Sequence, residues 1–183
     1  MFYKQKDQLR RWWFGLQTRC ILKSPPIRLD DVGPTLLTLL QHKDVQMYLA
    51  AIKSFARRLA PNEVHIVDDG SLTNEDHILL GKHVPGLVIH ALKTYREADL
   101  PIGGCWERLS AVARLSETQY VIQLDADTLT VGDIPEVAMA LTGLRADHCL
   151  YYYIILERHT IQNYKVLEFY QFLMSHIRTL NKN

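Results

Sequence analysis

The sequence predicts an α/β fold in which a mostly parallel sheet is flanked by helices. Short apolar runs that suit buried strands alternate with stretches whose apolar residues recur at helical spacing, and such alternation favours a parallel sheet. Two of the apolar runs, Glu63–Val67 and Tyr120–Leu124, end in acidic residues. Ligands of open α/β sheets bind outside the carboxyl ends of the strands. We therefore expect the functional site at these acidic strand ends.

The composition suits one globular domain. The 183 residues are 48% hydrophobic, and the formal net charge is +1. The apolar share is enough for a core, and the balanced charge gives no reason to expect a nucleic-acid partner. Three well-separated cysteines form no CxxC pair, which favours reduced thiols and a cytoplasmic location. No apolar run approaches the roughly 20 residues of a membrane span, and no signal-peptide core is visible.

The first segment, residues 1–28, is basic. It holds seven Lys and Arg residues and a single acid, Asp7, with Trp12, Trp13 and Phe14 among them. Bases interleaved with aromatics suit peripheral contact with an anionic membrane surface. The alternative, favoured because no clean amphipathic period is visible, is a surface helix that packs its tryptophans on the domain. Ser24-Pro25-Pro26 ends the segment as a linker.

The next elements form a strand–helix–strand unit. Thr35–Gln41 suits a core strand, and Lys43–Leu59 has apolar residues at the i, i+3, i+4, i+7 spacing of a helix. The second strand, Glu63–Val67, runs into Asp68-Asp69-Gly70-Ser71. A carboxylate at this position is able to bond a ribose hydroxyl. An ordinary strand-to-helix turn, with Thr73 or Asn74 as the helix N-cap, explains the stretch equally well.

Three further elements lead to the second acidic strand end. Asn74–His83 is expected to be a helix, and Leu87–Leu92 a third strand. Residues 93–104 form an irregular link, after which Trp106–Leu115 is expected to be a helix that carries Arg108. The strand Tyr120–Leu124 follows. A last helix is expected to open at Asp133 as N-cap, with Pro135 in its first turn.

Asp125 and Asp127 directly follow the strand Tyr120–Leu124. Strand residues two apart share a face, so we expect the two carboxylates to converge. Converging carboxylates repel each other unless a cation lies between them, and hard divalent ions such as Mg²⁺ or Mn²⁺ take oxygen ligands and bridge to phosphates. The alternative is that both residues belong to an ordinary turn.

Two stretches resemble the glycosyltransferases of the GT-A fold, which use nucleotide-diphospho-sugars as donors. HIVDDGSLTNEDHILL resembles their nucleotide-binding segment, and CWERLSAVARLSETQYVIQLDADTLTVGDIPEV resembles the segment with their DxD motif. The second stretch is similar to the retaining branch, in which an Arg-bearing helix precedes a strand ending in LDAD and a following GD turn. The resemblance extends from about Leu36 to Ala140, and the two motifs together are more specific than either alone.

The resemblance implies a metal-dependent donor site. A Mn²⁺ or Mg²⁺ ion held by Asp125 and Asp127 would clamp the diphosphate of a nucleotide-sugar, with a UDP-sugar as the expected donor. Arg108 would lie near the donor diphosphate or sugar. Asp68 or Asp69 would contact the base or the ribose.

Gln41 and His42 complete this implied site. They lie at the end of the first strand and would line the nucleotide pocket. The resemblance assigns no catalytic residue and no acceptor.

The matching pattern fades after Ala140. Tyr151–Leu156 is expected to be a strand and Thr160–Leu180 an amphipathic helix, and His148, His159 and His176 are spare candidates for a further metal ligand. We therefore divide the chain into a basic segment (1–28), a nucleotide-sugar-binding domain (29–147) and a C-terminal tail (148–183). The expectation is a shortened family member that binds its donor, transfers weakly or not at all, and self-associates through an uncovered face.

Two alternatives to a transferase remain. The first is a catalytically inactive nucleotide-binding module that uses the same residues. The second, less favoured, is a phosphatase that resembles the haloacid dehalogenases, with Asp125 as nucleophile and Asp127 as general acid and base. The second acidic pair of such phosphatases follows the nucleophile in the sequence, whereas Asp68 and Asp69 precede it.

Overall fold

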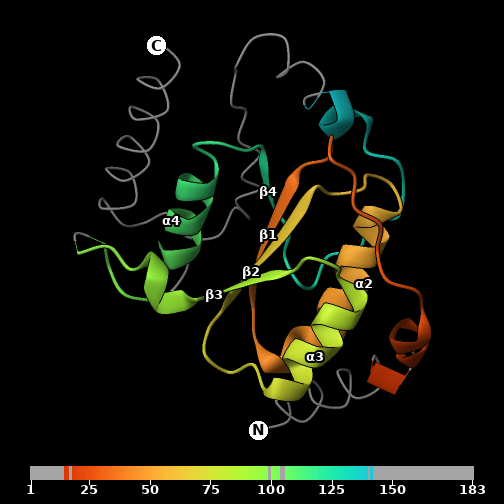
Figure 1. Ribbon diagram of the computed structural model, residues 1–183, viewed down its shortest axis with the longest axis horizontal. Helices are drawn as coiled ribbons and strands as arrows, with labels where there is room; N and C mark the ends of the chain where they lie inside the picture. Colours follow the sequence, from red (N-terminus) through yellow and green to blue (C-terminus); the bar gives the residue numbers. More distant parts are fainter. Residues whose placement is uncertain (1–14, 17, 99, 104–105, 140, 142–183) are drawn as a thin grey trace, which may run out of the picture.

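The chain forms a parallel sheet with helices on both faces (Figure 1). The computed structural model describes residues 15–16, 18–98, 100–103, 106–139 and 141. Within them the sheet has four strands in the order β3-β2-β1-β4, and every neighbouring pair is parallel. The predicted α/β class is confirmed. The strands are β1 (Thr35–Leu40), β2 (Glu63–Asp68), β3 (Val88–Ala91) and β4 (Val121–Gln123).

Strand β1 lies at the centre of the sheet because its sequence, TLLTLL, is apolar toward both faces. Leu36, Leu37 and Leu40 are fully buried, as expected for a strand that is covered on both sides. Its register places Leu40 beside Asp68 of β2 and Leu37 beside Gln123 of β4. The carboxyl ends of these three strands therefore meet at one edge of the sheet.

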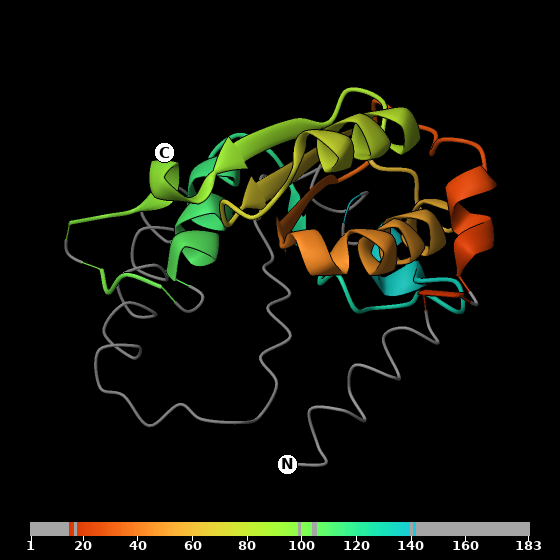
Figure 2. The same ribbon diagram turned by 90° about the horizontal axis from the view of Figure 1, so that it is seen from below.

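Two helical layers cover the sheet. Helices α2 (Val45–Ala56) and α3 (Asn74–His83) lie on one side of the strands, and α4 (Trp106–Leu115) lies on the other (Figure 1). The perpendicular view again separates α4 from α2 and α3 (Figure 2). Each side has its own core. The α2 and α3 side is built around Tyr48, Leu49, Ile52, Ile66 and Leu80, and the α4 side around Leu37, Val67, Tyr95, Ala111 and Val112.

The strand order reverses between β1 and β4. From β1 the chain adds β2 and then β3 on one side, and it returns by α4 to add β4 on the other side of β1. In doubly wound sheets the ligand crevice forms at this reversal, where neighbouring connections leave the sheet in opposite directions. The carboxyl ends of β1 and β4 thus flank the expected crevice.

Most element bounds agree closely with the sequence. Helices α3 and α4 have the predicted bounds, and Thr73 is the N-cap of α3. Helix α2 is shorter than predicted because a 3₁₀ turn, η2 (His42–Asp44), precedes it and it ends at Ala56. The link after β3 was expected to be irregular but begins with a 3₁₀ turn, η3 (Leu92–Tyr95).

The prediction that Asp133 caps the last helix is wrong. Residues 135–139 are helical, and the carbonyl of Ile134 accepts from the backbone N–H groups of Val137 and Ala138. The Asp133 carboxylate instead accepts a hydrogen bond from Nη1 of Arg58 at 3.0 Å. Asp133 therefore joins this loop to the end of α2.

The described part of the basic N-terminal segment packs on the domain. The 3₁₀ turn η1 (Arg19–Lys23) contributes Ile21 and Leu22 to the α2 and α3 side of the core. Gln46 of α2 donates to the carbonyl of Gly15 and to Oγ1 of Thr18. The residues on which the membrane expectation rested, Trp12 to Phe14, lie outside the described residues, as do the predicted strand Tyr151–Leu156 and helix Thr160–Leu180.

No helix in the described ranges is both long and apolar enough to cross a membrane.

Candidate functional site

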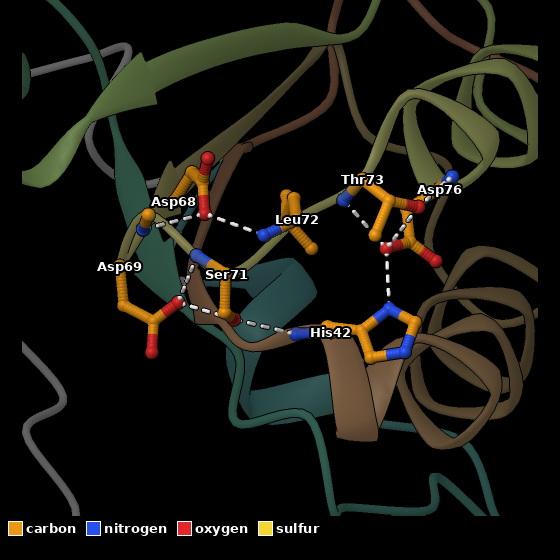
Figure 3. Close-up of polar contacts among 8 residues, drawn as sticks. His42, Asp68, Asp69, Ser71, Leu72, Thr73 and Asp76 are labelled. Carbon is orange, nitrogen blue, oxygen red and sulfur yellow. Dashed lines mark hydrogen bonds and ion pairs between the residues drawn. The ribbon is translucent and has the colours of Figure 1, made fainter.

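The loops that follow β1 and β2 are joined at the carboxyl edge of the sheet (Figure 3). The backbone N–H of His42, after β1, donates to Oγ of Ser71, after β2, at 2.9 Å. Two positions earlier in each loop, the N–H of Asp69 reaches the carbonyl of Leu40 at 3.5 Å. These bonds continue the β1–β2 pairing beyond the strands and fix the edge that would face a ligand.

Asp68 and Asp69 each hold the turn after β2 in place with one carboxylate oxygen. Oδ1 of Asp68 accepts from the N–H groups of Gly70 at 2.8 Å and Leu72 at 3.2 Å. Oδ1 of Asp69 accepts from the N–H of Ser71 at 3.0 Å and from its hydroxyl at 2.6 Å. Gly70 has φ +96°, a conformation that favours glycine. Within the described chain neither Oδ2 atom has a hydrogen-bond partner. The two residues can therefore hold the turn with one oxygen and offer the other to a ligand, so the two interpretations of this stretch are compatible.

Asp76 is a residue of this site that the sequence reasoning missed. Its Oδ2 lies 2.6 Å from Nδ1 of His42 and also accepts from the N–H of Thr73 at 2.8 Å. The Thr73 hydroxyl in turn accepts from the N–H of Asp76, which completes a capping box. The spacing Thr73-x-x-Asp76 is the sequence signal for that box, but it does not reveal His42 as the second partner.

The His42–Asp76 contact favours an imidazolium–carboxylate pair. The hydrogen bond from the ring and the negative charge of Asp76 raise the pKa of His42 above 6.5. Burial of Asp76 alone would raise its own pKa, but hydrogen bonds from Thr73 and His42 outweigh burial and lower the pKa of Asp76. The His42 side chain is 59% exposed, against 10% for Asp76. The ring is therefore reachable from solvent while its partner is held in place.

Asp125 and Asp127 lie in a turn and not on the strand. Strand β4 ends at Gln123, and Leu124 is the last residue bonded to β1, through its N–H to Leu37 at 2.9 Å and its carbonyl to the Thr38 hydroxyl at 2.7 Å. The Asp125 carbonyl then accepts from the N–H and the hydroxyl of Thr128. The prediction that the two carboxylates share a strand face is wrong, because strand alternation has ended before Asp125.

Arg108 of α4 contacts the first of these carboxylates. Its Nη1 donates to Oδ1 of Asp125 at 2.7 Å, and Nε2 of Gln123 lies 3.4 Å from the same oxygen. The Nε atom of Arg108 is buried without a hydrogen-bond partner among the described residues. Asp127 is exposed and has no polar contact in that part of the chain. Three of the four carboxylate oxygens of the DxD turn are thus open.

Asp125 and Asp127 supply carboxylate oxygens, the kind of ligand that a hard divalent cation takes together with water and substrate oxygens. In the described ranges no group of three His, Cys, Asp or Glu residues is arranged to hold a metal. Mg²⁺ binds through one or two carboxylates together with waters and substrate phosphates, so a pair suffices. Asp125 and Asp127 are the residues that would hold it. The spare histidines His148, His159 and His176 lie outside the described residues.

The predicted site residues fall into two groups on either side of the end of β1. Asp69 and His42 are joined through Ser71, and Asp68 precedes Asp69 in the same turn, whereas Asp125 and Arg108 form a separate pair. Gln41 lies between the groups as the half-buried residue after β1. No polar contact links the two groups within the described chain.

Comparison with protein-family models found no match for this chain, and comparison with curated proteins found none either.

Proposed function

We propose that this protein binds a nucleotide-diphospho-sugar together with a divalent cation, in the manner of a GT-A glycosyltransferase. The observation that carries the proposal is the position of the two acidic loops. Asp68 ends β2 and Asp69 follows it, and Asp125 and Asp127 follow β4, on opposite sides of the central strand β1. This is the strand reversal of a parallel sheet, where nucleotides bind in doubly wound folds.

The free oxygen atoms suggest a division of roles. The Oδ2 atoms of Asp68 and Asp69, opposite the oxygens that hold the turn, accept hydrogen bonds from the ribose. Asp125 and Asp127 hold Mn²⁺ or Mg²⁺ against the diphosphate, and Arg108 adds a second positive charge beside them. A bound divalent ion would neutralise the charge that develops on a departing diphosphate.

A calorimetric titration tests the proposal. UDP-glucose is titrated into the full chain with Mn²⁺, and then with chelator. We expect binding that depends on Mn²⁺ and weakens at least tenfold in Asp125→Asn and Asp127→Asn. Asp133→Asn is the matched control, because Asp133 is exposed in the same loop but pairs with Arg58. Equal affinity with and without the metal would rule out the proposed site.

A further measurement separates transfer from binding alone. Consumption of UDP-glucose is followed across a panel of carbohydrate acceptors and with water as the only acceptor. Acceptor-dependent turnover supports a transferase, whereas metal-dependent binding without turnover supports a nucleotide-binding module. In both cases the same residues would bind the nucleotide-sugar.

A further inference from the structure

His42 lies just beyond the end of β1, the strand between those that lead to the two acidic groups. It follows β1 directly after Gln41, and β1 lies between β2 and β4. Neighbouring strands are about 4.8 Å apart, so the ends of β2 and β4 are separated by roughly 10 Å. A nucleotide with its ribose at Asp68-Asp69 and its diphosphate at the DxD turn has to pass over the end of β1. The proposed function therefore brings a phosphate close to His42.

The geometry of His42 suits a hydrogen-bond donor. Asp76 contacts Nδ1 at 2.6 Å and is itself fixed by Thr73. This contact places the proton of the neutral ring on Nδ1 and orients the ring, in the way that carboxylates orient catalytic and metal-binding histidines. In Figure 3 the second ring nitrogen, Nε2, is turned away from Asp76. It has no partner among the described residues.

The hydrogen bond from the His42 ring to Asp76 and the negative charges around the ring raise the pKa of His42 and so favour its protonated form. Asp76 contacts it directly, and Glu75 on the same first turn of α3 acts in the same direction. Lys43 and Asp44 are the next two residues of η2. The carboxylate of Asp69 is also near, because it accepts from the Ser71 hydroxyl, which in turn accepts from the backbone N–H of His42. A protonated ring has an N–H at Nε2, and a charged donor of this kind makes a strong hydrogen bond to a phosphate oxygen.

We propose that His42, oriented by Asp76, donates a hydrogen bond from Nε2 to a phosphate oxygen of the bound nucleotide. This inference rests on the proposed function and adds to it a phosphate contact made by the protein at the end of β1. His42 is thus a binding residue, and Asp76 is its positioning residue.

The test follows UDP-glucose affinity from pH 5.5 to 8.5 with saturating Mg²⁺. Both phosphates of this ligand are esterified, so they gain no proton in that range. We expect the wild-type affinity to fall about tenfold as pH rises through the pKa of His42. The titration of the His42 ring is read separately from its NMR signals.

Two variants and one control isolate the contact. His42→Asn retains a donor toward Asp76 but lacks Nε2, so it is expected to bind at the weaker level at every pH. Asp76→Asn is expected to shift the loss of affinity to lower pH, because the carboxylate no longer stabilises the imidazolium. His77→Asn changes the exposed histidine next to Asp76 and is expected to behave as wild type.

The outcomes separate the two proposals. Mg²⁺-dependent binding that is the same in wild type and His42→Asn at every pH would overturn the role of His42 and leave the metal site standing. No binding of UDP-glucose by the wild type at any pH would overturn both.

Discussion

Nη1 of Arg108 donates to Oδ1 of Asp125 at 2.7 Å, so the guanidinium occupies a carboxylate oxygen that a divalent cation would also use. Arg108 is 26% exposed and Asp125 is 49% exposed, which makes this a partly screened pair of modest strength. In the proposed site, metal and arginine would therefore compete for Asp125 until a diphosphate gave Arg108 another anionic partner.

This competition predicts opposite effects of one substitution. Arg108→Gln is expected to raise Mn²⁺ affinity about two- to fivefold without nucleotide, because the competing ion pair is gone, and to weaken UDP-glucose binding. Mn²⁺ affinity is measured by electron paramagnetic resonance. Arg114→Gln is the control, since Arg114 lies on the same helix but pairs with Glu97. Unchanged Mn²⁺ affinity in Arg108→Gln would show that the pair does not compete with the metal.

The phosphatase alternative predicts a different chemistry at Asp125. A nucleophilic Asp125 would hydrolyse simple phosphate esters and would be inhibited by beryllium fluoride. We expect no hydrolysis of p-nitrophenyl phosphate by the wild type. Robust turnover that disappears in Asp125→Asn but persists in Asp133→Asn would replace the nucleotide-sugar proposal with the phosphatase.

The capping box of α3 predicts a stability effect at the site. Thr73→Ala removes the hydroxyl that accepts from the N–H of Asp76, and N-cap losses of this kind cost about 1 kcal/mol. Urea unfolding measures the change. His77→Ala, on the exposed surface of the same helix, is expected to change stability by less than about 0.5 kcal/mol. Equal effects of the two substitutions would contradict a stabilising cap.

Two glycines are expected to respond to alanine in opposite directions. A Cβ on Gly33 would lie 2.0 Å from the carbonyl oxygen of Ala60, which is backbone and cannot rotate away, whereas one on Gly81 meets nothing within 4 Å. Gly33→Ala should destabilise the protein by about 2 kcal/mol or more. Gly81→Ala, in the interior of α3, should stabilise it by about 0.5–1 kcal/mol. Thermal unfolding of both variants is the measurement, and a Gly33→Ala protein as stable as wild type would contradict the close approach.

The burial of His83 leads us to expect that the protein loses stability in acid. His83 is 1% exposed, and burial, followed by the charges of Lys53 and Lys82, lowers its pKa below 6.5. The unfolded chain therefore takes up this proton first, and the stability from neutral His83 is complete above about pH 6.5 and declines as the pH falls. Urea unfolding at pH 7.5 and 5.5 should show a smaller decline in His83→Leu than in wild type. An equal decline in both proteins would show that His83 does not titrate on unfolding.

The sequence was sufficient for the architecture because its signals are local. Helical spacing together with the cap at Thr73 set the bounds of α3, and the alternation of strands and helices indicated a parallel sheet. From a parallel sheet it followed that Asp68 and Asp125 would lie at one edge. The end of β4 was misplaced because an apolar run shows where a strand can form but not where the chain turns.

The side-chain pairings within the site could not be predicted from the sequence because they join residues that are far apart along the chain. His42 and Asp76 are 34 positions apart, and Arg108 and Asp125 are 17 apart. Each contact depends on which strands become neighbours and on which turn a helix begins. Asp76 also has a sufficient local explanation as part of a capping box, and this conceals its second role beside His42.

The place of β4 beside β1 has a consequence for the folding of the nascent chain. Strands β1, β2 and β3 add to the sheet in the order of their synthesis. The other edge of β1 is paired only when β4 has been made, since Thr35 pairs with Val121. At about 5–20 residues per second, the most apolar strand keeps one edge open for several seconds after it leaves the ribosome. An open strand edge is a template for aggregation, so this interval is when the chain is most exposed to aggregation.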